Sequence, residues 1–231
     1  MAALTLDFLA GLAHELRTPL GAIGGYAELM ELGVHGPVTP AQADGLQRIL
    51  KNQQLMVSLI NAFMAYAEAA DGTVSMERVP VGVAGAISRA IDDVATRALE
   101  KSIDLVVERS ASSEDLVVLG DVDAVEAIVS ELLLDGVESS APNGEVRISG
   151  SISADSVLLE ISSSGDMIPP SAVELAFIPF DRVGKGNRVS AAPHALSLPR
   201  ARALARAMGG EVAVVPGSFL RALSVVLPRS R

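Results

Sequence analysis

The sequence predicts an α+β protein in which an antiparallel helical hairpin, forming a dimeric four-helix bundle, precedes an α/β sandwich. Two observations carry this prediction. Up to about residue 70, apolar residues recur at intervals of three and four, as they do on amphipathic helices. Beyond residue 80, short β-rich runs alternate with helical segments, which is typical of layered α/β folds. Asp71-Gly72 to Pro80 is the predicted linker, so we expect domains at 1–72 and 80–231.

The first helix is predicted over residues 2–33. One apolar stripe runs along it, because residues spaced by three and four share a helix face. The stripe consists of Leu9, Leu12, Leu16, Leu20 and Ile23.

The second helix is predicted over residues 41–69 and has the stronger start signal. Thr39 can cap it, Pro40 suits the first helical position, and Gln42 completes a Thr-x-x-Gln capping box. Its apolar stripe consists of Leu46, Ile49, Met56, Ile60 and Phe63.

The link between the two helices, GVHGPVT, is short enough to make them antiparallel neighbours. Two helices alone expose too much apolar surface. We therefore expect a homodimer that closes a four-helix bundle.

The second half predicts alternating helices and strands, with a hairpin formed by the two runs of alternating apolar residues. Helices are expected at 82–101, 122–139, near 171–176 and at 195–208, and strands at 103–108, 115–119, 145–153, 156–164, 211–215 and 222–227.

Composition excludes several classes of protein. The net charge of −10 argues against a nucleic-acid partner, which would require a basic face. The absence of cysteine excludes disulfides and thiol catalysis and fits a reducing, cytoplasmic setting. No apolar run is long enough to span a bilayer, so we expect no membrane insertion. The opening MAALTLDFLAGLAHEL lacks a basic segment and contains Asp7, which argues against a signal peptide.

The segment HELRTPL, residues 14–20, interrupts the first helix with polar side chains and a proline. His14 lies two residues from Leu12 and from Leu16, so it faces away from the apolar stripe, and Thr18 shares its face. Pro19 has no N–H for the carbonyl of Glu15, so we expect the helix to bend just past the histidine. An exposed imidazole beside a carboxylate can act as a nucleophile. A solvated helix face with a proline kink is the plain alternative.

HELRTPL resembles the phosphoacceptor box of two-component sensor histidine kinases. In that family the helical hairpin dimerises, and the box histidine exchanges a phosphoryl group with an aspartate on a response regulator. The resemblance implies that His14 is the phosphoacceptor and Glu15 its acid–base partner. It implies that Thr18 positions water for dephosphorylation of the regulator.

The resemblance extends along the second half. Residues 120–140, GDVDAVEAIVSELLLDGVESS, resemble the family's asparagine box, and AFIPFDRV at 176–183 resembles its phenylalanine box. Residues 201–228 resemble its closing helix and strands. The implied fold is the histidine-kinase-type ATPase α/β sandwich shared with gyrase and chaperone ATPases.

The implied nucleotide site departs from the family pattern where chemistry is expected. Asp135 replaces the magnesium-binding Asn, and Glu138 replaces a basic residue that meets phosphates. Ser163 replaces the aspartate that accepts from adenine, whereas Gly165 matches the first glycine of that box, and Met167 stands two residues later where the backbone should approach the ligand. Pro193-His194-Ala195-Leu196-Ser197-Leu198 aligns with the second glycine box and holds no glycine.

Other features of the sequence are compatible with an ATP site. Glu131 lies one turn before Asp135, like the catalytic Glu of related ATPases, although an ordinary polar helix position explains it equally well. Lys185 and Arg188 lie in the segment aligned with the ATP lid and could meet phosphates, although a solvated loop is the preferred interpretation. His35 and His194 stand far apart in loops, which disfavours a metal cluster.

Three hypotheses follow. The first is a histidine phosphotransferase, or a phosphatase version of it, in which His14 exchanges a phosphoryl group with a response regulator receiver domain and no cofactor is used. The second is an ATP-dependent, autophosphorylating kinase with an unusual site in which Asp135 binds magnesium and Glu131, Ser163 and Gly165 line the nucleotide. The third is a non-catalytic scaffold. We favour the first, as a homodimer with an upstream kinase as a further partner. The chain is expected to be a free-standing soluble protein or the output part of a longer one.

Overall fold

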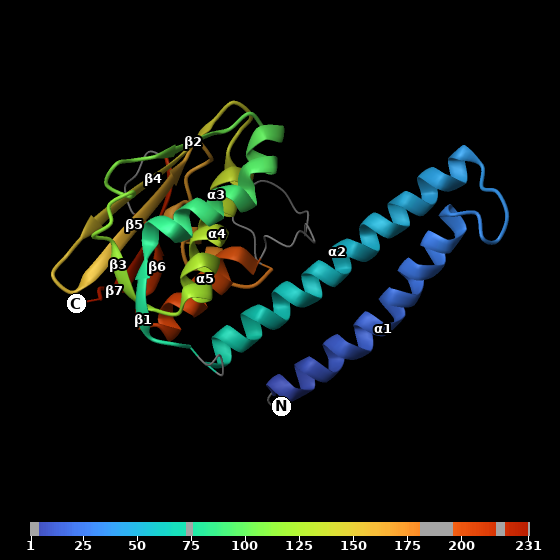
Figure 1. The fold of residues 1–231 in the computed structure, drawn as a ribbon, viewed down its shortest axis with the longest axis horizontal. Coiled ribbons are helices and arrows are strands. Elements are labelled where there is room, and N and C mark those ends of the chain that lie inside the picture. Colours follow the sequence, from blue (N-terminus) through green and yellow to red (C-terminus); the bar gives the residue numbers. More distant parts are fainter. Residues whose placement is uncertain (1–4, 73–75, 181–195, 216–219, 231) are drawn as a thin grey trace.

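The computed structural model describes residues 5–72, 76–180, 196–215 and 220–230. Two long antiparallel helices, α1 (Leu6–Glu31) and α2 (Pro40–Asp71), form a rod that projects from a mixed α/β body (Figure 1). This is the predicted helical hairpin followed by an α/β sandwich.

The start of α2 is the one that the sequence predicts. Thr39 Oγ1 accepts from the backbone N–H of Gln42 at 3.3 Å, and Gln42 Oε1 accepts from the backbone N–H of Thr39 at 2.9 Å. Pro40 occupies the first helical turn, where its missing N–H leaves no bond unmade. This reciprocal capping box fixes where the hairpin turn ends.

The two helices of the hairpin pack through small residues. Ala13, Leu20, Gly24 and Ala27 are the buried residues of α1. A Cβ added at Gly24 would lie 3.1 Å from the side chain of Gln53, so glycine there lets the two helices approach closely. Most of the predicted stripe on α1 remains exposed in the single chain, including Leu12, Leu16 and Ile23.

A five-stranded sheet in the order β2-β4-β5-β7-β6 forms the body, beside a two-stranded sheet of β1 and β3. The strands are β1 (Val79–Gly82), β2 (Asp104–Val107), β3 (Val117–Gly120), β4 (Glu145–Ile152), β5 (Ser156–Ser163), β6 (Glu211–Val214) and β7 (Arg221–Pro228). Strands β4 and β5 pair antiparallel, which confirms the predicted hairpin.

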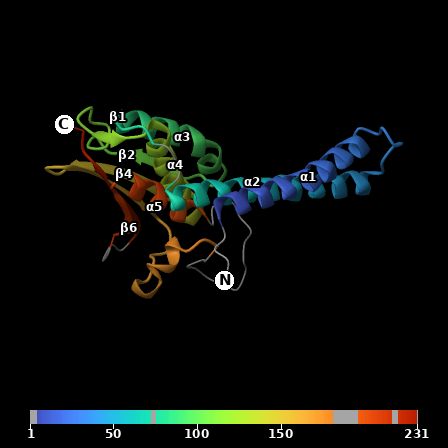
Figure 2. The same cartoon turned by 90° about the horizontal axis from the view of Figure 1, so that it is seen from below.

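Three helices cover one face of the five-stranded sheet: α3 (Val83–Glu100), α4 (Val122–Ser139) and α5 (Ser197–Ala207) (Figures 1 and 2). Helix α4 lies in the centre of the core and buries apolar residues on every turn, among them Ile128, Leu132 and Leu133. Its remaining side chains reach the edge of the core, where the candidate site lies.

Two details of the predicted fold are wrong. Residues 79–80 belong to strand β1 and not to the linker, because their backbone pairs antiparallel with β3. The helix expected near 171–176 is instead a pair of short 3₁₀ turns, η1 (Pro170–Ala172) and η2 (Leu175–Phe177). Helix α1 continues through Pro19 as one element. The division into domains at 1–72 and 80–231 stays a prediction.

Candidate functional site

His14, Glu15 and Thr18 are exposed on the hairpin, on the third and fourth turns of α1. Thr18 Oγ1 donates to the backbone carbonyl of His14 at 3.2 Å, so the side chain of Thr18 is held beside the histidine. Ala13, which directly precedes His14, is buried in the hairpin at 4% exposure. The imidazole is therefore carried by a packed helix and accessible from solvent, as a phosphoacceptor must be.

Arg17, within HELRTPL, makes a contact that the sequence alone did not reveal. Its Nε and Nη2 atoms both donate to Oδ1 of Asn61 on α2, at 3.1 and 2.9 Å. The heptad-like spacing along α2 places Asn61 between the apolar positions Ile60 and Phe63, but it does not indicate which α1 residue it meets. This clasp joins the two helices one turn past His14.

Asp135, the predicted metal ligand on α4, forms a two-point ion pair with Arg221 of β7. Arg221 Nε lies 2.8 Å from Asp135 Oδ2, and Arg221 Nη2 lies 2.9 Å from Oδ1. The side chains of Arg221 and Asp135 are only 12% and 16% exposed. Both carboxylate oxygens are therefore engaged by a charged fork of good geometry.

Glu131, one turn earlier on α4, pairs with Arg200 of α5 at 2.8 Å. The Nε atom of this arginine is buried without a hydrogen-bond partner in the described part of the chain. Ser197 Oγ, in the first turn of α5, is likewise buried without a partner there. Glu131 thus tethers α5 to α4.

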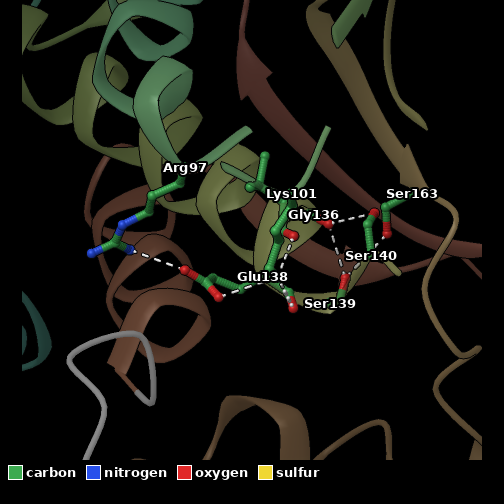
Figure 3. A network of polar contacts seen from close by, with 8 residues as sticks. Arg97, Lys101, Gly136, Glu138, Ser139, Ser140 and Ser163 are labelled. Atoms are coloured by element: carbon green, nitrogen blue, oxygen red, sulfur yellow. Dashed lines mark hydrogen bonds and ion pairs between the residues drawn. The ribbon is translucent and has the colours of Figure 1, made fainter. Parts of the chain in front are cut away.

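Glu138, the last acid on α4, faces α3. Arg97 Nη1 lies 3.3 Å from its Oε1, and Lys101 Nζ lies 3.4 Å from its Oε2 (Figure 3). Lys101 also donates to the carbonyls of Val137 and Glu138 at 2.9 and 2.8 Å, where the last turn of a helix needs donors. The negative charge at position 138 is therefore balanced by Arg97 of α3 and by Lys101, the residue that ends this helix.

Ser163, at the end of β5, is buried at 2% exposure and shares a 3.2 Å hydrogen bond with Ser139 at the end of α4 (Figure 3). Gly165 follows closely: a Cβ there would lie 2.7 Å from the carbonyl oxygen of Ser139. Met167 is 52% exposed. The two positions aligned with the adenine-binding box thus pack against the end of α4.

The residues aligned with the magnesium and adenine sites are engaged with one another and with their neighbours. Asp135 directs both oxygens to Arg221, and Ser163, paired in register with Arg221 across β5 and β7, offers a hydroxyl already bonded to Ser139. No group of three or more His, Cys, Asp or Glu side chains in the described residues could hold a metal ion. Lys185, Arg188, Pro193, His194 and Ala195 lie outside the described residues.

The helical hairpin with its exposed histidine and the α/β sandwich that follows it each match a known family model. Residues 5–72 match the family model of the His Kinase A (phospho-acceptor) domain. Residues 120–230 match the model of the histidine kinase-, DNA gyrase B- and HSP90-like ATPase. The chain belongs to the two-component sensor histidine kinase family.

Curated relatives agree with this assignment. The cell-division control histidine kinase PdhS of Brucella canis is 27% identical over 218 residues, which cover 90% of this chain and 21% of PdhS. The hybrid signal transduction protein dokA of Dictyostelium discoideum is 26% identical over 220 residues, 93% of this chain and 13% of that protein. The chain thus spans about a fifth or less of the length of these relatives.

Solved structures share the fold. Full-length ShkA in complex with AMPPNP superposes with a TM-score of 0.76 at 23% identity, covering 97% of this chain and 46% of ShkA. The mycobacterial sensor histidine kinase MprB gives a TM-score of 0.55 at 25% identity, covering 67% of this chain and 99% of that structure. Among the described residues, no helix has the length and apolar character needed to cross a bilayer.

Proposed function

We propose that this protein is a histidine phosphotransferase, or a phosphatase of the same type, that works on a response regulator without using ATP. His14 accepts a phosphoryl group from a phosphorylated aspartate of a receiver domain and can return it to such an aspartate. The supporting observation is the contrast between an accessible HELRTPL turn and a nucleotide region closed by internal ion pairs.

The exchange balances without a further reactant. An imidazole nitrogen of His14 attacks phosphorus, the new N–P bond forms, and the aspartyl O–P bond breaks to leave a carboxylate. In the reverse direction the carboxylate attacks and the imidazole leaves with the electron pair of the N–P bond. Such transfer needs alignment and charge stabilisation more than covalent help from the protein. Glu15 orients the imidazole or holds its proton, and Thr18, beside His14, positions water when the regulator is dephosphorylated.

ATP binding would be opposed by the pairs already made. A nucleotide whose magnesium bound Asp135 would have to displace Arg221 from that carboxylate. Breaking a buried ion pair of this kind costs about 3–5 kcal/mol when one partner is left uncompensated. The autophosphorylating kinase is the second candidate, since Glu131 remains at the position of the catalytic Glu of related ATPases.

Family membership implies a response regulator as partner and dimerisation of the hairpin. A homodimer is further supported by the exposed apolar side chains of Leu12, Leu16 and Ile23 on α1 and of Ile49 and Met56 on α2. Ile23, Ile49 and Met56 line a groove of about 270 Å³ between the helices. A second hairpin seated there would remove this surface from water.

The deciding experiment labels His14. Receiver domains from the same genome, phosphorylated beforehand with radioactive acetyl phosphate, are mixed with the protein, and acid-labile, alkali-stable label on the protein is counted. We expect the parent protein to be labelled, His14→Gln to remain folded and unlabelled, and Thr18→Ala to be labelled but to slow loss of phosphate from the regulator.

A parallel measurement separates this function from the kinase. With millimolar ATP and magnesium, we expect no heat of binding and no label from γ-labelled ATP. Micromolar affinity for ATP, or labelling of His14 from ATP alone, would replace the phosphotransferase by the kinase. Equal labelling of parent and His14→Gln by the receiver domains would show that the label is not on His14, and no label on either protein would favour the scaffold.

A further inference from the structure

The turn that carries His14 has a built-in weakness. Pro19 has no N–H, so the carbonyl of Glu15 lacks its helical donor, one residue past the histidine. The side chain of Thr18 bonds to the carbonyl of His14, which already accepts within the helix, and does not replace the missing bond. A phosphoacceptor on such a turn needs support from outside its own helix.

Asn61 of α2 supplies a contact at that turn. Its Oδ1 accepts from both Nε and Nη2 of Arg17, at 3.1 and 2.9 Å, so two donors of the rigid guanidinium converge on one acceptor. Arg17 is three residues from His14, and residues at this spacing are neighbours on a helix surface. Fixing Arg17 therefore fixes the rotation of the turn that presents the imidazole.

The acceptor is an amide and not a carboxylate. No described carboxylate forms an ion pair with Arg17, so the guanidinium keeps its positive charge beside the site where an anionic phosphoryl group arrives. An acid at position 61 would hold the same geometry but would cancel that charge. Asn61 thus suits a role in which the turn is held without neutralising the arginine.

We propose that Asn61 is a positioning residue for phosphoryl transfer: through Arg17, it holds the weakened turn of α1 against α2 so that His14 is presented in one orientation. This inference rests on the proposed phosphotransfer function for its kinetic readout. Its structural readout is independent of that function.

The test compares Asn61→Ala with Asn61→Asp and with Gln54→Ala. Gln54 is an exposed residue of α2, one helical turn or more from every residue of the clasp. Hydrogen exchange by mass spectrometry follows the backbone amides within 13–19, to which Pro19 contributes none. Transfer from a phosphorylated receiver domain is measured at increasing receiver concentration. Because Asn61 and Arg17 are both exposed, these variants are expected to fold.

We expect Asn61→Ala to raise the exchange rate in 13–19 about tenfold and to lower the maximal transfer rate about tenfold. Loss of one ordinary hydrogen-bonded contact supports an effect of this size. The receiver concentration at half-maximal rate should stay within about twofold. Asn61→Asp should keep the protection of the parent, and Gln54→Ala should match the parent in both measurements.

A double-mutant comparison isolates the contact. If Asn61 acts through Arg17, then adding Asn61→Ala to Arg17→Ala should change neither measurement further. Additive losses would overturn the proposal, and so would Asn61→Ala exchanging and transferring like the parent. A lowered melting temperature with an unchanged maximal rate would show a merely structural residue and would also overturn it.

The two proposals fail in different ways. If the parent protein is never labelled by any receiver domain, the phosphotransfer function is wrong, while the exchange of 13–19 in Asn61→Ala and Asn61→Asp still decides whether the clasp holds the turn. If the parent is labelled and Asn61→Ala is equally fast, only the positioning role is wrong.

Discussion

At the scale of single residues, Asp135 distinguishes the ATP-dependent kinase from the phosphotransferase that does not use ATP. An Asn at this position binds magnesium in the kinase pattern, so under the kinase reading Asp135→Asn should strengthen nucleotide binding. The ion pair between Asp135 and Arg221 predicts instead that Asp135→Asn lowers the stability of the fold. Replacing the carboxylate by an amide leaves Arg221 without a counter-charge in a site where both side chains are less than a fifth exposed.

We therefore expect Asp135→Asn to lower the free energy of unfolding by about 1–3 kcal/mol, less than complete loss of the pair because an amide oxygen can still accept from Arg221, and to confer no ATP binding. Urea unfolding and calorimetry measure the two effects. The double variant Asp135→Asn with Arg221→Met should recover part of the loss, because no buried charge is then left alone. A more stable Asp135→Asn protein that binds Mg–ATP would contradict the paired arrangement.

The same residues show what sequence can and cannot predict about a site. Alignment of the motif is enough to identify Asp135 and Glu138 as departures from the family, since their position on the helix follows from local spacing. Their partners are not predictable in this way. Arg221 lies 86 residues from Asp135 along the chain, and only the register of β5 with β7 brings it to α4.

At the scale of elements, Glu211 ties the start of β6 to α5. Arg202 Nε lies 2.6 Å from its Oε1 and Arg206 Nε lies 2.9 Å from its Oε2. Burial alone would raise the pKa of Glu211, but the hydrogen bonds and charges of Arg202 and Arg206 outweigh burial and hold this pKa below its ordinary value of 4.5. Two ion pairs thus join the end of α5 to the start of β6 across the tight turn between them.

A pKa lowered by folding means that folding favours the carboxylate. The resulting stability is complete above the unfolded-state pKa and is lost as the pH falls through the lower folded-state pKa. We expect Glu211→Gln to cost about 0.5–1 kcal/mol at pH 7, since these pairs are partly exposed, and to cost nothing once the pH is well below 4.5. Urea unfolding at several pH values measures this.

Glu114→Gln is the matched control, because Glu114 is exposed in a loop. It should unfold like the parent at every pH. A Glu211→Gln protein whose deficit persists unchanged into acid would show that packing, and not the charge of Glu211, joins α5 to β6.

Most elements follow from local pattern. Helix α4 begins at Val122 and ends at Ser139 as predicted, because Asp121 caps its start and apolar residues fill its core face. Strand β1 could not be recognised, since four residues containing a proline show no clear alternation and are held only by pairing with β3. The sequence predicts a helix near 171–176 because the residues of the two 3₁₀ turns there resemble a short helix in local composition.

At the scale of the whole molecule, the end of α2 packs against the sandwich. Ala69, near the end of α2, is 3% exposed and belongs to the hydrophobic core of the sandwich. The rings of Phe63 on α2 and Phe180 stack with centroids 6.1 Å apart. A cavity of about 440 Å³ remains beside this seam, lined by α2, η2 and α5. The last turns of α2 therefore serve both parts of the protein.

The exposed apolar face of the hairpin is the remaining large feature of the molecule. Ile23 is 49% and Met56 is 50% exposed in the single chain, so charges placed there should cost the folded monomer little. In a dimer the same positions would be buried, and an unpaired charge would cost several kcal/mol. Ile23→Glu and Met56→Lys are therefore expected to convert a dimer to folded monomers.

Light scattering at micromolar concentration, with circular dichroism to confirm folding, measures this. Gln54→Glu is the control, because Gln54 lies on the opposite face of α2 from Met56 by helical spacing. Gln47, also on that face, is unsuitable because it donates to Glu31 at 3.2 Å, and a carboxylate there would repel its neighbour. If the parent protein is a monomer at these concentrations, or if both charged variants remain dimers, then the hairpin does not pair through the face that carries Ile23 and Met56.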